Sequence, residues 1–339
     1  MKACIKAISY YLPEKVLTNE DLVKIFTEWS VEKIASKIGV NQRHISAESE
    51  TASDMATKAA ELLFMENPEV KKESIDFIIF CTQSPDYFLP TSACLIQDRL
   101  GMSKTLGAFD FNQGCSGYIY GLSIAKGLIF GGIASNILLL TAETYSKYIH
   151  PKDKNNRTIF GDGASASVIS GDGFADIGNF SLGTDGGGAN NLIVKSGASR
   201  FPRQVNDLSF DLNTNPTSSD HLFMNGSEIF NFTAEEVPKL VNDVMNKNNI
   251  NKSDINLYVF HQANKYMINY LRKLLGIERE KFYEYLENVG NTVSSTIPIA
   301  LSEAKKENKL TGKILLAGFG VGYSWGGVLV ETFPLGKTF

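Results

Sequence analysis

The stretch AFDFNQGCSGYIYGLSIAKGLIFGG, residues 108–132, decides the fold of this chain. The apolar run that leads into it, residues 106–111, predicts a buried strand, and residues 112–114 predict a turn. Apolar side chains then recur at helical spacing, at Tyr118, Leu122, Ala125 and Ile129. Cys115 is therefore expected at a helix N-terminus, where free N–H groups and the helix dipole favour the nucleophilic thiolate. A small core residue is the alternative interpretation of this cysteine.

The order of elements in this half repeats later in the chain. IDFIIFCTQS at 75–84 is matched by INLYVFHQAN at 255–264, and NILLLTAE at 136–143 by KILLAGFG at 313–320. Between these pairs, one strand is expected to end at Gly114–Cys115 and another at Gly290–Asn291. The matched positions lie about 180 residues apart, which indicates an internal repeat.

The repeat predicts an α/β protein of two similar halves, each made of strands and helices and packed about a pseudo-two-fold axis. We place the first half at residues 1–172, with the nucleophile, and the second at residues 173–339. Equivalent loops of such halves converge. His261 and Asn291, at the ends of two expected strands of the second half, should therefore approach Cys115 of the first.

Composition excludes several function classes. The net charge of −4 gives no general preference for nucleic acid or anionic membranes, and charged or small residues interrupt the longest apolar stretches, so no membrane span is expected. Four cysteines without CxxC spacing and an N-terminus without a signal-peptide pattern predict a cytoplasmic protein with free thiols. The four scattered histidines predict no zinc site, and neither GxGxxG after a first strand nor a P-loop occurs.

One polar segment stands out from this strand and helix pattern. Residues 197–221 are rich in Asn, Ser, Thr and Pro. A long excursion of this composition predicts a cap or flap rather than core.

Five motifs, in order and spacing, resemble those of the β-ketoacyl-acyl carrier protein synthase III family of the thiolase-like superfamily. They are GCSG around Cys115, FGDGA at 160–164, HQAN at 261–264, VGNTVSSTIP at 289–298 and FGVGYSWGGVLVE at 319–331. The resemblance covers nearly the whole chain. It implies a thiolase-like fold of two pseudo-symmetric halves in α-β-α-β-α layers.

The resemblance also implies a two-stage reaction without a cofactor, in which a CoA thioester is substrate. Cys115 would take the acyl group from an acyl-CoA, and malonyl-acyl carrier protein would then lose carbon dioxide and attack that group as an enolate, giving a β-ketoacyl thioester. His261 and Asn291 would donate hydrogen bonds to the enolate oxygen. The backbone N–H groups of Cys115 and Val321 would form the oxyanion hole for acyl transfer. Val321 stands where the family commonly has Gly, so it should reshape the pocket.

Further positions carry over from the family motifs. Gly226, Phe230 and Asn264 resemble residues that line the pantetheine tunnel, Trp29 resembles the tryptophan that stacks on adenine, and Lys154 and Arg157 fall near the CoA phosphates. Leu89 matches a residue that the partner subunit of a homodimer inserts at the end of the acyl pocket, and a leucine there favours a primer longer than acetyl. On the surface for the carrier, Tyr266 and Asn231 replace expected basic residues, which leaves Lys265, Arg272 and Lys273.

Other functions fit part of this pattern. A Cys-His-Asn hydrolase of papain type would use the same residue types, but the CG[SA]C[WY] run is missing and the repeat has no place in that fold. A thiolase would want a second cysteine in the C-terminal loop, where FGVGYSWG has none. An acyltransferase that moves the acyl group to an alcohol or amine shares the first half-reaction and stays open, as does a hydroxymethylglutaryl-CoA synthase. A non-enzymatic acyl-binding module requires an inert Cys115. Chain length, carrier and pathway stay open too.

Overall fold

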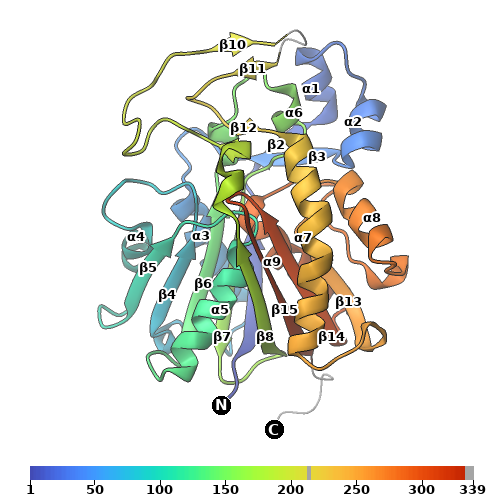
Figure 1. Cartoon of the computed structure of the whole chain (residues 1–339). Coiled ribbons are helices and arrows are strands. Elements are labelled where there is room, and N and C mark those ends of the chain that lie inside the picture. Colours follow the sequence, from blue (N-terminus) through green and yellow to red (C-terminus); the bar gives the residue numbers. More distant parts are fainter. Residues whose placement is uncertain (212–214, 333–339) are drawn as a thin grey trace.

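The computed structural model describes residues 1–211 and 215–332 (Figure 1). Within these residues, nine strands form one mixed sheet in the order β13-β14-β15-β8-β1-β7-β6-β4-β5. The strands of the first half are β1 (Cys4–Tyr11), β4 (Phe77–Cys81), β5 (Gly107–Phe111), β6 (Asn136–Glu143) and β7 (Gly163–Ser170). Those of the second half are β8 (Ala175–Thr184), β13 (Ile255–Phe260), β14 (Gly312–Gly320) and β15 (Ser324–Thr332).

The sheet has the predicted internal symmetry. β1 and β8 pair antiparallel at its centre. Outward from them, β7, β6 and β4 follow on one side, and β15, β14 and β13 follow on the other. In both series the innermost pair is antiparallel and the outermost pair parallel. The repeat is therefore confirmed in the sheet, and the division placed at 172/173 falls in the turn between β7 and β8; the domain boundaries themselves stay a prediction.

One predicted element is wrong. The segment before Gly290–Asn291 forms no strand. Where the second half would have its equivalent of β5, there is an isolated bridge between Tyr258 and Phe282. The reason is chemical: FYEYLENVG carries acidic and amide side chains, whereas AFDF before Cys115 is mostly apolar. Its hydrogen bonds go instead to turns, such as Gly290 N–H to Leu286 O at 2.8 Å.

We call β1, β7, β6, β4 and β5 the first wing of the sheet, and β8, β15, β14 and β13 the second wing. Helices cover both faces of the two wings and fill the space between them (Figure 1). α3 (Ala52–Glu66) and α4 (Ser92–Arg99) lie on the outer face of the first wing, and α7 (Gly226–Lys247) lies on the outer face of the second, with α8 (Lys265–Leu274) beside it. α5 (Gly117–Phe130) and α9 (Thr296–Lys306) contact strands of both halves. The expected α-β-α-β-α layering is thus confirmed.

The central position of α5 explains its composition. A helix between the two wings of the sheet is largely apolar, and α5 buries Tyr118, Leu122, Ala125 and Ile129 as predicted. Gly121 permits the close approach to β6, because a Cβ there would lie 2.6 Å from Leu139 Cδ1. The apolar centre therefore fixes the start of α5 against both halves.

Smaller elements lie at one end of the molecule, above the sheet in Figure 1. They are α1 (Asn19–Ile25), α2 (Val31–Ile38), α6 (Lys154–Arg157), and the short strands β2 (Lys15–Thr18), β3 (Gln42–Ile45), β9 (Leu192–Ile193), β10 (Ser209–Phe210), β11 (Pro216–Thr217) and β12 (Phe223–Met224). The described part of the 197–221 segment carries the exposed β10–β11 hairpin. Asp207 accepts hydrogen bonds from Ser219, and Asp220 accepts them from the N–H groups of Val205 and Asn206.

Two general properties complete the fold. In the part of the chain that the structure describes, no helix combines the length and apolar character needed to cross a membrane, and no group of three or more His, Cys, Asp or Glu side chains is placed to hold a metal ion. The four cysteines are free thiols, three of them buried.

Candidate active site

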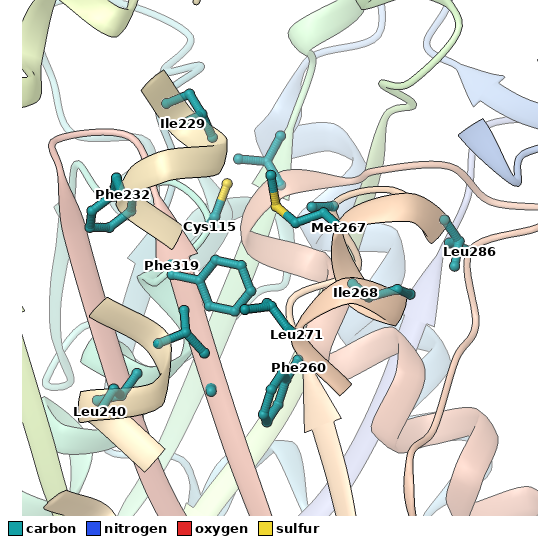
Figure 2. Close-up of a cluster of buried hydrophobic side chains, with 14 of the residues drawn as sticks. Cys115, Ile229, Phe232, Leu240, Phe260, Met267, Ile268, Leu271, Leu286 and Phe319 are labelled. Carbon is teal, nitrogen blue, oxygen red and sulfur yellow. The ribbon is translucent and has the colours of Figure 1, made fainter. Parts of the chain in front are cut away.

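Cys115 lies in the turn between β5 and α5, with Ser116 as the N-cap residue of that helix. The side chain is buried, and Figure 2 shows it near Ile229, Phe232, Met267 and Phe319, which come from the second half of the chain. β14 passes directly beside it, because a Cβ on Gly320 would stand 2.8 Å from Cys115 Sγ. Segments of the two halves thus meet at this thiol, whereas the approach of His261 and Asn291 to it stays a prediction.

The buried surroundings of the Cys115 thiol disfavour its ionisation. Burial, with the charge of Glu143 as a second cause, raises the pKa of Cys115 to about 12. The backbone N–H groups of Val321 and of Cys115 itself lower it, but by less. The expectation that the helix end favours the resting thiolate is therefore not met, because desolvation outweighs the N–H donors.

Val321 presents the expected backbone donor to the thiol. The Val321 side chain occupies the space beside Gly114. A Cβ on Gly114 would lie 2.4 Å from Val321 Cγ1 and 2.7 Å from Gln83 Oε1. Val321 has no left-handed backbone conformation, so a β-branched residue fits there without strain. The substitution of Gly by Val is thus accommodated by the glycine at 114.

Gly320→Ala is expected to slow acylation of Cys115 by about 10²-fold, because the added methyl group forces the thiol away from the Val321 N–H and small displacements of a reacting atom cost that much. The rate would be followed by mass spectrometry of the acylated protein. Gly127→Ala is the matched control, since a Cβ at this helix position meets nothing within 4 Å. It should stabilise the fold by about 0.5–1 kcal/mol and leave acylation unchanged. Equal rates for both variants would contradict this assignment of the pocket.

His261 follows the last residue of β13 and is fully enclosed. Its backbone N–H donates to Ala317 O of β14 at 2.8 Å, and its ring lies edge-on to Phe319, with ring centroids 5.7 Å apart. Burial lowers the pKa of His261 to about 3. The imidazole is therefore neutral at physiological pH, which suits a hydrogen-bond donor better than a base.

Thr296, the first residue of α9, faces one nitrogen of that ring. Its Oγ1 lies 2.7 Å from His261 Nδ1, and its hydroxyl also reaches Val293 O at 3.1 Å. If the hydroxyl donates to Nδ1, the proton of the imidazole resides on Nε2. Within the described residues Nε2 makes no hydrogen bond, so this N–H is open to a ligand.

Asn291 is held by the FGDGA motif. Its backbone N–H donates to Ile159 O at 2.9 Å, and the Gly161 N–H donates to Asn291 O at 3.0 Å. Its side-chain Oδ1 accepts the Val293 N–H at 2.9 Å. The amide Nδ2 makes no hydrogen bond in the described chain, which leaves a second open donor.

Shared neighbours bring these motifs to one place. Thr296 joins His261 to Val293, and Val293 is hydrogen-bonded to Asn291. Gly318 and Gly320 of the strand that receives His261 lie against Cys115. The structure therefore links the segments of the thiol, the imidazole and the amide, which come from three distant motifs, through shared neighbours.

The residues expected near the CoA nucleotide gather at the end of the molecule that carries α1, α2 and α6 (Figure 1). Lys154 Nζ pairs with Glu28 Oε1 at 2.9 Å, and Glu28 precedes Trp29, whose ring lies 5.0 Å from Lys33 Nζ. Arg157 is half-buried, donates to Pro151 O at 2.8 Å and lies over the Phe26 ring. Trp29, Lys154 and Arg157 thus share one corner.

The residues expected along the tunnel belong to two helix starts. Gly226 is the first residue of α7 and has open space around its Cα. Phe230, one turn later, contacts the rings of Tyr266 and Tyr270 of α8 at centroid distances of 5.7 and 4.7 Å. Asn264 caps α8, since its Oδ1 accepts the Met267 N–H at 2.9 Å. That oxygen therefore has a structural partner already.

Sequence reasoning missed several residues of the site, notably Glu143, Gln83, Thr296 and Phe319. Glu143 left one visible signal, because it is a charged residue that closes the apolar run NILLLTAE. The other three have no individual signal. Their roles depend on which segments meet in space.

Comparison with known proteins gives consistent matches. Two family models match, 3-Oxoacyl-[acyl-carrier-protein (ACP)] synthase III over residues 109–186 and the C-terminal model of the same family over residues 245–332. The β-ketoacyl-[acyl-carrier-protein] synthase III of Caldanaerobacter subterraneus is 37% identical over 325 residues, 95% of each chain. That of Fusobacterium nucleatum is 34% identical over 333 residues, 96% of this chain and 98% of the relative.

Solved structures agree with these sequence matches. A crystal structure of a 3-oxoacyl-(acyl-carrier-protein) synthase III has a TM-score of 0.95 at 47% identity, covering 98% of this chain and 100% of that one. The synthase III of Pseudomonas aeruginosa has a TM-score of 0.84 at 28% identity, with the same coverage. The similarity spans both halves and includes every motif of the site.

Proposed function

The chain belongs to the 3-oxoacyl-[acyl-carrier-protein] synthase III family of condensing acyltransferases, and we propose that Cys115, His261 and Asn291 perform the two half-reactions here. The substrates are an acyl-CoA and malonyl-acyl carrier protein. In the first half-reaction, Cys115 Sγ bonds to the acyl carbon while the C–S bond of acyl-CoA breaks, and the thiol proton leaves with the CoA sulfur. The backbone N–H groups of Cys115 and Val321 stabilise the oxyanion.

The second half-reaction uses the two open donors. Loss of carbon dioxide from the malonyl group places negative charge on its thioester oxygen, and His261 Nε2–H and Asn291 Nδ2–H are available to bind it. The enolate carbon then attacks the acyl group on Cys115, and the regenerated thiolate takes up a proton. Donors fixed in advance in a dry site are worth most where charge develops.

One observation carries this assignment over the alternatives: His261 is a neutral donor and not a base. Its Nδ1 faces the Thr296 hydroxyl rather than a carboxylate, and burial lowers its pKa to about 3. Transfer of the acyl group to an alcohol or to water would need a base to deprotonate the acceptor. Decarboxylative condensation needs only stabilisation of the enolate.

The CoA nucleotide is assigned to the corner of Trp29, Lys154 and Arg157, and the pantetheine arm to the helix starts that carry Gly226, Phe230 and Asn264. Two cations near a partly buried aromatic ring fit a phosphorylated purine. For the carrier protein, Arg272 is largely engaged in a hydrogen bond to Ile277 O, so Lys265 and Lys273 are the exposed positive charges on α8. The surface that meets an acidic carrier is therefore weakly charged.

A homodimer is proposed through the loop between β4 and α4 and the outer edge of β5. Tyr87, Phe88 and Leu89 expose 63%, 83% and 83% of their side chains, and β5 is the terminal strand of the sheet. An exposed apolar cluster beside an open strand edge favours a second copy as partner. Leu89 of each subunit would then reach the acyl pocket of the other.

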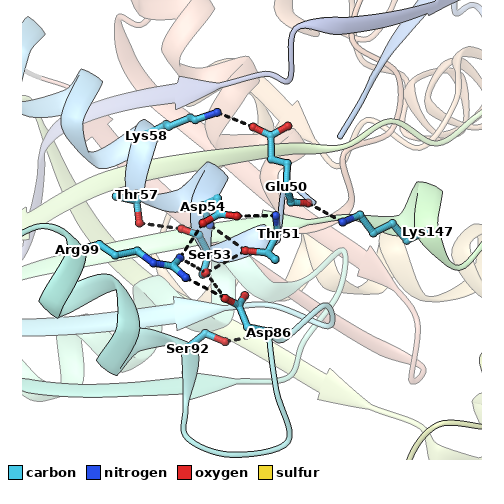
Figure 3. A network of polar contacts seen from close by, with 10 residues as sticks. All are labelled: Glu50, Thr51, Ser53, Asp54, Thr57, Lys58, Asp86, Ser92, Arg99 and Lys147. Carbon is cyan, nitrogen blue, oxygen red and sulfur yellow. Dashed lines mark hydrogen bonds and ion pairs between the residues drawn. The ribbon is translucent and has the colours of Figure 1, made fainter. Parts of the chain in front are cut away.

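A polar network holds the base of this loop, as Figure 3 shows. Asp86 Oδ2 accepts hydrogen bonds from Ser53 Oγ at 2.6 Å and from Arg99 at 3.3 Å, and the Asp86 N–H donates to Ser92 Oγ at 3.3 Å. Arg99 also pairs with Asp54 at 3.0 Å. The exposed apolar tip is thus presented from a fixed stem, which lowers the entropy lost on association.

Phe88→Asp is expected to convert a dimer into a monomer, because it places a charge at the centre of the apolar cluster. Sedimentation velocity at micromolar concentration measures the change. Ile25→Asp, at another exposed apolar position, on α1, is the control and should stay dimeric. A wild-type protein that sediments as a monomer would contradict the proposed dimer.

A panel of acyl-CoAs of rising chain length tests the proposed function. Mass spectrometry would identify which acyl groups label Cys115, and the labelled protein would then be offered malonyl-acyl carrier protein, an alcohol or an amine. We expect a β-ketoacyl product from the malonyl carrier alone. Transfer to the plain nucleophiles without carbon–carbon bond formation would favour the acyltransferase instead.

A further inference from the structure

Glu143 is a fully buried acid that the mechanism above does not use. It is the last residue of β6, and its carboxylate accepts the Gln83 N–H at 3.2 and 3.0 Å, the Ser84 hydroxyl at 3.2 Å and the Ser294 hydroxyl at 2.9 Å. Across residues 1–211 and 215–332, no ion pair reaches it. A buried acid with donors but no cation is costly and calls for an explanation.

Its partners belong to segments that support the nucleophile. The Gln83 side chain touches the turn before Cys115, since a Cβ on Gly114 would lie 2.7 Å from Gln83 Oε1, and Gln83 Nε2 donates to Asn112 Oδ1 at 2.8 Å. On the other side, Ser294 Cβ lies 3.4 Å from where a Cβ on Gly117 would stand. Glu143 therefore ties together the two segments between which Cys115 is held.

The titratable groups around Glu143 all become negatively charged when they ionise. Five of them interact with the Glu143 charge: Cys81 at the end of β4, Cys115 before α5, Tyr145 and Tyr148 after β6, and Asp162 before β7. Burial raises the pKa of Glu143 to about 8, and the Glu143 charge in turn raises the pKa values of Cys115 and Cys81. Two such groups in one dry pocket do not readily ionise together.

We propose that Glu143 is a positioning residue for Cys115, which fixes the segments beneath the nucleophile and, when ionised, opposes formation of the Cys115 thiolate. The proposal rests on the proposed acylation of Cys115. There the Sγ–acyl bond forms, the C–S bond of acyl-CoA breaks, and the thiol proton departs with the CoA sulfur. A protonated Glu143 adds no negative charge against that developing anion, whereas an ionised one does. The free thiol is also kept from reacting before the acyl-CoA is bound, because only a thiolate is a good nucleophile.

Glu143→Gln tests the electrostatic part. The amide keeps the size of the side chain and can still hydrogen-bond Gln83 and the two serine hydroxyls, but it carries no charge. The rate at which iodoacetamide alkylates Cys115 would be measured from about pH 6 to about pH 9, with the modified peptide identified by mass spectrometry. Because Glu143 is ionised only above about pH 8, we expect the alkylation rates of the Gln variant and the wild type to match near pH 6, and the Gln variant to be several-fold faster near pH 9. An unchanged profile would overturn the proposal.

Asp76→Asn is the control. Asp76 is another acid held by backbone donors, the N–H groups of Ser135 and Asn136 at 2.8 and 3.1 Å, and its charge is not among the influences on Cys115 or Glu143. We expect its alkylation profile to match the wild type. A shift equal to that of Glu143→Gln would assign the effect to general loosening of the fold and overturn the proposal.

Glu143→Asp separates the effect of the Glu143 hydrogen bonds on the position of Cys115 from the effect of the Glu143 charge. It keeps the charge but shortens the reach to Gln83 and Ser294, so the alkylation profile should stay at the wild-type pH while acylation by acyl-CoA slows. A profile shifted like that of the Gln variant would contradict the role of the charge. Alkylation does not involve acyl-CoA, so a failure of the proposed function would show instead as the absence of acyl label on wild-type Cys115.

Discussion

Cys115→Ala is expected to abolish acylation by acyl-CoA and to lower the condensation rate by at least about 10⁴-fold, because the acyl-enzyme forms through the Cys115 thiol. The variant should nevertheless still decarboxylate malonyl-acyl carrier protein, since the donors of His261 and Asn291 do not depend on the thiol. Carbon dioxide release and β-ketoacyl product would be measured on the same sample. The account thus predicts decarboxylation without carbon–carbon bond formation.

Cys94→Ala is the control for this variant, because Cys94 is an exposed thiol on α4. It should keep the wild-type rates of both steps. Acyl label on Cys115→Ala, or loss of condensation in Cys94→Ala, would mean that the nucleophile has been placed at the wrong cysteine.

His261→Ala and Asn291→Ala are expected to lower decarboxylation of malonyl-acyl carrier protein by about 10²–10³-fold each, the loss typical of one oxyanion donor. Acylation of Cys115 should be spared, because its oxyanion is bound by the backbone N–H groups of Cys115 and Val321. The two half-reactions would be timed separately, by acyl label for the first and carbon dioxide release for the second.

Thr296→Val refines the same test. It removes the hydroxyl that faces His261 Nδ1 and so frees the imidazole to adopt the other tautomer. A smaller loss of decarboxylation than in His261→Ala is expected. If the His261 and Asn291 variants lose both half-reactions equally, the division of roles between side-chain donors and backbone donors is wrong.

The fold was largely predictable because apolar periodicity reports directly on burial. α5 buries the four side chains expected from its spacing, and the repeat is realised as two matching series of strands beside β1 and β8. The exception at residues 282–290 shows the limit of the argument. A repeat predicts that a segment has a counterpart, but local composition decides whether that counterpart is a strand.

Candidate site residues could be proposed from the sequence, whereas the electrostatics of their surroundings could not. Cys115, His261 and Asn291 could be named from three motifs, yet the ionisation of the thiol depends on what surrounds it. The position at a helix start argues for a thiolate, whereas enclosure and the charge of Glu143 argue for a thiol and prevail. Neither enclosure nor the approach of Glu143 from β6 is visible in GCSG, because both arise from contacts between distant segments.

The same reason explains why the donor role proposed for His261 required the structure. HQAN places a histidine after a strand, but the hydroxyl that faces its Nδ1 comes from Thr296, 35 positions away. Val321 is the converse case. Its side chain departs from the family pattern, and the space beside Gly114 shows how the backbone donor is retained.

The most direct test of the central claim is the mass of the intact protein after brief incubation with acyl-CoA, followed by peptide mapping. The account predicts the addition of one acyl group per chain, on the peptide that contains Cys115, and its loss when malonyl-acyl carrier protein is added and a β-ketoacyl product appears. An unmodified Cys115, or an acyl group on another residue, would contradict it.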